Sequence, residues 1–118
     1  MSGDFSIHYD IDKKAQFKGT SANLAQHLKL HMEYPDIAKR SGVEDNVVMS
    51  FVVSKHGQII YLNIDQEPST INEEISVELQ KAAFKAVKST NGMWMPAEKD
   101  GKYVVSKMIL PIEFKLDK

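Results

Sequence analysis

The sequence contains no cysteine, so neither a disulfide framework nor a thiolate metal site is available to this chain. It has no apolar run long enough for a membrane-spanning helix, and its start lacks the apolar stretch of a signal peptide. It has no excess of either charge, since 15 basic and 16 acidic residues are mixed along 118 positions. This balance removes the electrostatic reason to expect nucleic acid as a partner, or a polybasic contact with a membrane.

The usual patterns of catalytic chemistry are also missing. No glycine-rich phosphate loop is present, because the glycines are isolated turn residues. No nucleophile, base and orienting group can be placed by spacing, so the sequence indicates neither an enzyme nor a cofactor. His27 and His31 share a predicted helix face and could bind a metal together with Glu33. The simpler interpretation is a histidine pair that flanks an apolar stripe, and we expect no metal.

The residues that are present form patterns typical of a single domain over residues 1–118, with residues 1–4 expected to lie outside the fold. The clearest pattern is a pair of segments, 47–54 and 59–65, that are rich in the β-branched and aromatic residues typical of strands. A tight turn that contains Gly57 separates them, and glycine adopts positive φ most easily there. These residues predict a β-hairpin.

Before the hairpin, alternating apolar and polar residues predict a short strand at 5–11. A polar connector follows at 13–19, and either Thr20 or Ser21 is the expected N-cap of a helix. The apolar stripe of that helix consists of Leu24, Leu28 and Met32, widened by Ala25 and Leu30.

Two further helices are predicted by their end signals. Pro35 breaks the first helix and can open a second, short one, which Gly42 ends. Thr70, with Glu73 three residues later, fits a capping box for a long helix that runs to about Ser89. Its apolar stripe has helical spacing and consists of Ile75, Leu79, Ala82, Ala83, Ala86 and Val87.

Trp94 lies between two methionines just after the long helix. An apolar cluster of this kind could anchor a partner protein. We favour the other interpretation, closure of the core, because tryptophan can bury a large apolar area by folding back on the helix.

The last stretch, 101–116, is the longest with strand character and follows the turn dipeptide Asp100-Gly101. Pro111 lies inside it, and proline has no N–H to donate to a ladder, so it belongs at a sheet edge or a bulge. We therefore predict a strand at or near an edge, where a second chain can pair with it. Together the elements predict an α+β fold with two layers, in which helices pack on one face of a small, mainly antiparallel sheet.

Read in order, the motifs resemble the C-terminal domain of TonB energy transducers, in the forms found in Bacteroidetes-type bacteria. The resemblance covers about residues 17–116. It depends on Tyr34-Pro35 followed by Ala38 and Gly42, the hairpin FVVSKHGQI, the alanine-rich helix before Trp94-Met95-Pro96, and the terminal run GKYVVSKMILPIEF. The sequence departs from the family pattern at Asp45 and Ala97, where glycine is usual, and at Leu79-Gln80, where Leu-Asp is usual.

The resemblance implies a periplasmic domain with two helices on a three-stranded antiparallel sheet. It also implies a partner: the TonB box, a short N-terminal segment of TonB-dependent outer-membrane receptors, which adds as a strand beside the last strand. Inner-membrane motor proteins would be engaged through an N-terminal tether that is absent from this sequence, and strand exchange makes a homodimer possible. The partner-binding residues expected on this basis are Tyr34, Pro35, Tyr103, Val104, Val105, Ser106, Lys107, Met108, Ile109 and Leu110.

One alternative stays open at the level of sequence. The absent anchor is also compatible with a stand-alone envelope adaptor or scaffold protein that reuses the TonB/TolA fold. An upstream spanning helix with a proline-rich region would favour the transducer, and a bare signal peptide would favour the adaptor.

Overall fold

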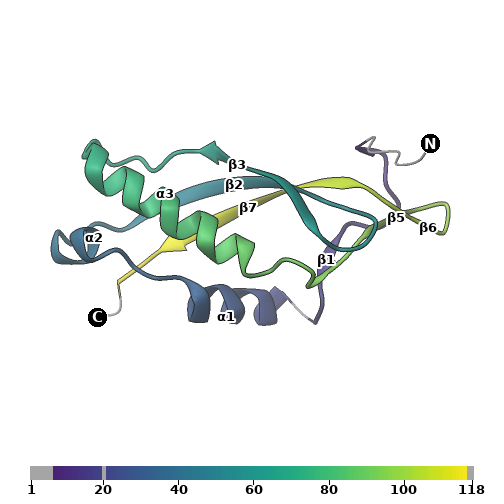
Figure 1. Ribbon diagram of the computed structural model, residues 1–118, viewed down its shortest axis with the longest axis horizontal. Coiled ribbons are helices and arrows are strands. Elements are labelled where there is room, and N and C mark those ends of the chain that lie inside the picture. The colour runs from purple at the N-terminus through teal and green to yellow at the C-terminus, as the bar shows by residue number, and fades with distance from the viewer. Residues whose placement is uncertain (1–6, 20, 117–118) are drawn as a thin grey trace.

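The computed structural model describes residues 7–19 and 21–116 (Figure 1). The predicted exclusion of residues 1–4, the start of the predicted first strand and the proposed cap Thr20 lie outside this part of the chain. The elements are β1 (Gln16–Phe17), α1 (Ser21–His31), α2 (Asp36–Arg40), β2 (Asp45–Val53), β3 (Ile59–Gln66), α3 (Glu73–Lys88), β4 (Trp94–Met95), β5 (Ala97–Lys99), β6 (Lys102–Val104) and β7 (Ser106–Phe114).

The central sheet has the strand order β3-β2-β7, and both of its pairings are antiparallel. β2 and β3 form the predicted hairpin, and Gly57 in its turn has φ of +78°. β2 and β7 pair without a register shift from Asp45 opposite Phe114 to Val53 opposite Ser106. The α+β class with a mainly antiparallel three-stranded sheet is therefore confirmed.

The two outer strands of the sheet differ in regularity. The β2–β3 register shifts twice, between Val48 and Met49 and between Ser50 and Val52. Tyr61, inside β3, has φ of +52°, a conformation that side chains other than glycine rarely adopt. β3 therefore carries bulges, whereas β7 pairs with β2 without one.

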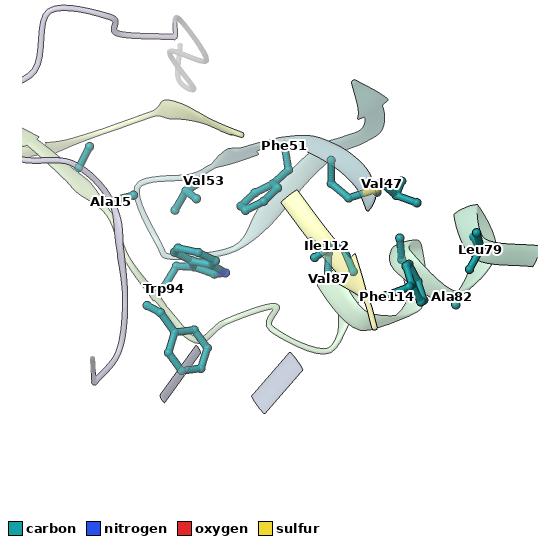
Figure 2. Packing of buried hydrophobic residues seen from close by; sticks show 14 of the residues in the cluster. Ala15, Val47, Phe51, Val53, Leu79, Ala82, Val87, Trp94, Ile112 and Phe114 are labelled. Carbon is teal, nitrogen blue, oxygen red and sulfur yellow. The ribbon is translucent and has the colours of Figure 1, made fainter. Parts of the chain in front are cut away.

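Helix α3 crosses one face of the sheet and provides most of the helical share of the core (Figures 1 and 2). Alternate residues of β2 face it, because side chains along a strand alternate between the two faces. These β2 residues are Val47, Met49, Phe51 and Val53, and they pack in one cluster with Leu79, Ala83 and Val87 of α3 and with Ile112 and Phe114 of β7. The long helix and its apolar stripe were predicted correctly.

Helix α1 runs along the margin of the sheet on the β7 side (Figure 1). Leu24 and Leu28 lie on its inner side but are only half-buried. The expectation that Ala25 and Leu30 widen this stripe was wrong, since both residues are exposed and Leu30 is 75% exposed. α1 is thus more loosely covered than α3.

Trp94 closes the core at the end of the molecule where the β2–β3 turn and Gly57 lie (Figure 2). It is 2% exposed and packs against the rings of Phe17 and Phe51. Its indole N–H donates a hydrogen bond of 3.0 Å to Thr90 Oγ1, which satisfies the polar end of the buried ring. The core interpretation of Trp94 is correct.

The strand predicted at 5–11 was wrong over its described part, residues 7–11, which have no strand structure. The strand in this region is β1, inside the stretch interpreted as a polar connector, and it pairs with β4. Phe17 and Ala15 are buried there, so two apolar residues in a polar sequence carry the contact with the core.

The stretch 101–116 is two strands rather than one. β6 folds back on β5 as a hairpin whose turn residues, Asp100 and Gly101, both have positive φ. This is the geometry in which an Asp-Gly turn matches the twist of paired strands. β7 then begins at Ser106, and Val105 lies between the two strands.

The cap predicted for the long helix was wrong, and one of the two caps offered for the first helix is excluded. The N-cap of α3 is Asn72, whose Oδ1 accepts a hydrogen bond of 3.0 Å from the backbone N–H of Ile75. Thr70 lies two residues earlier and accepts from the N–H of Asn72 instead. Ser21 is already inside α1, so it is not the residue that precedes the helix.

Candidate functional site

The feature of this fold that is suited to binding is the free side of β7. β2 pairs with one side of β7 along all nine of its residues. On the other side, no strand from residues 7–19 or 21–116 pairs with it. We call this side, over Ser106–Phe114, the β7 edge; its unpaired N–H and C=O groups can form hydrogen bonds with another extended chain.

Two shallow clefts run along the β7 edge, on the side where α1 lies. One has a volume of about 410 Å³ and is lined mainly by apolar side chains, among them Phe17, Leu24, Met108 and Leu110. The other has a volume of about 390 Å³ and lies between α1 and the second half of β7, lined among others by Leu28, Met32 and Pro111. A strand added to the β7 edge would therefore have apolar space beside it for some of its side chains.

Five of the ten expected partner-binding residues, Ser106 to Leu110, lie in the first half of β7. Their side chains alternate as a half-covered strand requires: Ser106 is buried, Met108 and Leu110 are half-buried, and Lys107 and Ile109 are exposed. Ile109 keeps 55% of its surface, which is high for an isoleucine.

Three further expected residues lie before β7, in the β5–β6 hairpin or directly after it. Tyr103 pairs with Glu98 and Val104 with Ala97 in the β5–β6 hairpin. The C=O of Val105 accepts a hydrogen bond of 2.8 Å from the backbone N–H of His8. In this structure the available edge therefore begins at Ser106, three residues later than the sequence predicts.

Tyr34 and Pro35 lie at the far end of the molecule from the β5–β6 hairpin. The ring of Tyr34 packs edge-on against Phe114, with ring centroids 5.7 Å apart, and its hydroxyl donates a hydrogen bond to the C=O of Val43. Burial raises the pKa of the Tyr34 phenol, and the nearby Glu44 and Asp45 carboxylates add to that rise. These contacts fasten the α1–α2 connection to the end of β7; Pro35 itself lines a separate cleft between α2 and α3.

Sequence reasoning missed the second half of the β7 edge, Pro111 to Phe114, as a part of the same surface. It also missed that the Asp-Gly turn closes a hairpin of its own. The Asp-Gly dipeptide itself is a hairpin signal, but Ala97, Glu98 and Lys99 before it are residue types that strands disfavour. The contact of His8 with Val105 has no sequence signal, because it joins two backbone groups.

The histidine pair does not form a metal site with Glu33. His27 Nε2 lies 3.3 Å from the C=O and 3.1 Å from Oγ of Ser89, the C-cap residue of α3, while Glu33 pairs with Lys85 at 3.6 Å. In the described part of the chain, no three histidine, cysteine, aspartate or glutamate side chains come together as metal ligands. His27 thus joins α1 to the end of α3.

These features define a small α+β domain that presents a regular, unpaired terminal strand beside apolar clefts. The family model for the Gram-negative bacterial TonB protein C-terminal domain matches residues 30–116. The chain therefore belongs to this family, which is a transport-associated family of non-enzymatic domains. No curated protein matches the chain significantly.

Two solved structures share the fold. Both are solution structures of the C-terminal domain of Helicobacter pylori TonB, and both are 20% identical to this chain. The form with residues 194–285 has a TM-score of 0.61 and covers 82% of this chain and 94% of its own length. The longer form, residues 179–285, has a TM-score of 0.57; the match covers 85% of this chain and 87% of that structure. Within the described residues, no helix is both long and apolar enough to span a bilayer.

Proposed function

We propose that this domain binds the TonB box of TonB-dependent outer-membrane receptors, and that the box adds to β7 as a fourth strand of the central sheet. The observation that carries the proposal is the β7 edge, nine residues long and without a register shift, in a chain of the TonB C-terminal family. Main-chain hydrogen bonds provide the affinity in such a pairing and make few demands on side-chain identity. One domain can then serve several receptors.

The structure offers two outer strands, and only one of them is suited to this role. β3 carries bulges and the left-handed Tyr61, and bulges of this kind hinder pairing with a further strand. β7 is regular, and its neighbouring clefts can accept side chains of the added strand. This difference supports β7 over β3 as the docking strand.

The family assignment also supports a cellular setting for this binding. We infer that the domain works in the periplasm of a Gram-negative bacterium, tethered to the inner membrane and its motor proteins through a preceding segment. A ladder of several main-chain bonds between β7 and the box would share a pulling load and couple inner-membrane energy to uptake. The same free edge makes a homodimer by mutual strand pairing a possible side product.

The test is a titration of the ¹⁵N-labelled domain with a synthetic peptide that carries the box of an outer-membrane receptor from the same bacterium. We expect saturable shifts in the amide resonances of β7, Ser106–Phe114, with little change in β3, Ile59–Gln66. A scrambled peptide of the same composition is the control. The proposal fails if no box peptide shifts β7, or if the shifts fall on β3.

A further inference from the structure

We propose that the visiting strand is held by the main-chain groups of Lys107 and Ile109, between a limit set by the chain's own segment at His8 and a second limit set by Pro111. This inference depends on the proposed function and adds the register to it. It follows from the direction in which each main-chain group of β7 points.

The direction is fixed first at the hairpin turn. The N–H of Ser54 donates a hydrogen bond of 2.8 Å to the C=O of Gln58, so the main chain of Ser54 points toward the β3 side. Successive residues of a strand direct their N–H and C=O groups to opposite sides in turn. Val53, and every second residue back to Asp45, therefore directs its main-chain groups toward β7.

The register of β2 with β7 transfers this alternation to β7. Val53 lies opposite Ser106, and in an antiparallel ladder both members of such a pair point toward each other. The β7 residues that bond to β2 are Ser106, Met108, Leu110, Ile112 and Phe114. Lys107, Ile109, Pro111 and Glu113 consequently direct their main-chain groups to the β7 edge.

Two observations at the end of the strand agree with this assignment. The N–H of Leu116, two residues beyond Phe114, donates a hydrogen bond of 2.8 Å to Glu44, the residue before β2. That bond lies on the β2 side, as the alternation requires. Pro111, which has no N–H, falls on the free side, where its missing donor leaves the β2 ladder intact.

The third observation lies at the start of the strand and shows a docked chain segment. Val105 is two residues before Lys107, so its C=O has the orientation of the free set. That C=O already accepts a hydrogen bond of 2.8 Å from the N–H of His8. The chain's own N-terminal segment thus makes at Val105 the kind of main-chain bond that a bound peptide would make at Lys107. This segment blocks the β7 edge at Val105.

The remaining window is short and defined. Lys107 and Ile109 each offer one donor and one acceptor, and Pro111 offers an acceptor only. Side chains of the visitor that fall on the helix side of the sheet lie next to Met108 and Leu110, above the cleft that Phe17 and Leu24 line. The register therefore selects an extended segment with an apolar side chain at that position, and it places the end of full pairing at Pro111.

The free protein provides a first test that needs no ligand. Amide hydrogen exchange followed by NMR on the whole chain should show fast exchange at Lys107 and Ile109, and protection at Met108 and Leu110. The opposite alternation, or equal protection at all four amides, would overturn the inference whatever peptides the domain binds.

Binding provides the second test, with the same receptor box peptide and calorimetry. Ile109→Pro removes a donor from the free side only, and should weaken binding at least about fivefold, while Ile109→Thr keeps the donor and should bind like the wild type. Pro111→Val adds a donor and should strengthen binding about fivefold. Exchange at β2 amides confirms that each variant is folded.

The outcomes separate the two proposals. If the peptide does not bind to the wild-type domain at β7, the proposed function fails. If it binds there, but Ile109→Pro and Pro111→Val both leave the affinity unchanged, the proposed function stands and the register is wrong.

Discussion

Asp45 is the residue that joins the start of β2 to the loop between β3 and α3. Its carboxylate accepts hydrogen bonds from the backbone N–H groups of Asn46, Ser69 and Thr70 at 2.8–3.0 Å, and from the Ser69 hydroxyl at 3.2 Å. Burial raises the pKa of Asp45, but these hydrogen bonds lower it by more, so the net pKa lies below its ordinary value. A glycine here would lack all of these bonds.

We therefore predict a pH-dependent cost for Asp45→Asn. A carboxyl group whose pKa is lowered by folding stabilises the protein above its unfolded-state pKa of about 3.9, and this contribution disappears as the pH falls through the folded-state value. The free energy of unfolding of the variant should be lower by about 1–2 kcal/mol at pH 7. Urea unfolding should show this gap closing below about pH 4. Asp65→Asn is the control, because Asp65 is exposed and its side chain makes no hydrogen bond or ion pair within the described chain. An equal loss of stability there would contradict the role of Asp45.

Gly57 is required by space as well as by backbone conformation. A Cβ atom at this position would lie 2.3 Å from the C=O oxygen of Trp94, and the residue has φ of +78°. Gly101 has nearly the same φ, +77°, with nothing within 4 Å of its Cβ position. Comparing alanine substitutions at Gly57 and Gly101 therefore separates the steric cost of the Cβ atom from the cost of the left-handed backbone conformation.

We expect Gly57→Ala to destabilise the domain by at least about 3 kcal/mol, and Gly101→Ala by about 1 kcal/mol, the cost of the left-handed conformation alone. Thermal and urea unfolding measure both. Equal losses for the two variants would mean that the turn can move away from Trp94 without cost.

At the scale of elements, the sequence predicts a helix or strand well where a long periodic pattern meets a single environment. α3 is such a case, since its stripe from Ile75 to Val87 faces the core along its whole length. β1 is the opposite case, because Phe17 is buried in a stretch too short for a pattern. The β7 edge falls between the two. Pro111 marked an edge strand, but the division at Val105 depends on the β5–β6 hairpin and on the distant contact with His8, and no local pattern encodes that contact.

The two larger helices should contribute unequally to stability. Leu79 of α3 is 0% exposed, whereas Leu28 of α1 is half-buried beside the cleft along β7. Leu79→Ala should cost about 3–4 kcal/mol, and Leu28→Ala about 1–2 kcal/mol, because a half-buried side chain loses fewer contacts and leaves no closed cavity. Urea unfolding of both variants checks this, and a larger loss for Leu28→Ala would show that α1 carries more of the core than its exposure indicates.

At the scale of the whole molecule, the folded unit begins before the region that defines the family. The family model matches residues 30–116, yet Ala15 and Phe17 belong to the buried cluster. The segment around them pairs with β4, with Glu98 and with Val105, so it spans the hairpin end of the domain (Figure 1). Phe17 meets Trp94 edge-on, with ring centroids 5.9 Å apart.

A chain that starts at Ser21 should therefore fold with lower stability than one that starts at Ile7. Removing Phe17, which is 7% exposed, uncovers one side of the buried Trp94 ring. The free energy of unfolding should fall by about 3 kcal/mol or more. Phe17→Ala in the full chain should reproduce most of that loss, whereas Tyr9→Ala, at a residue 75% exposed, should cost little. Urea unfolding of the two shortened chains, the two variants and the unmodified full chain measures these losses of stability. If the chain from Ser21 is as stable as the longer one, the N-terminal segment lies against a core that is complete without it, and the limit that His8 places on the β7 edge would be equally dispensable.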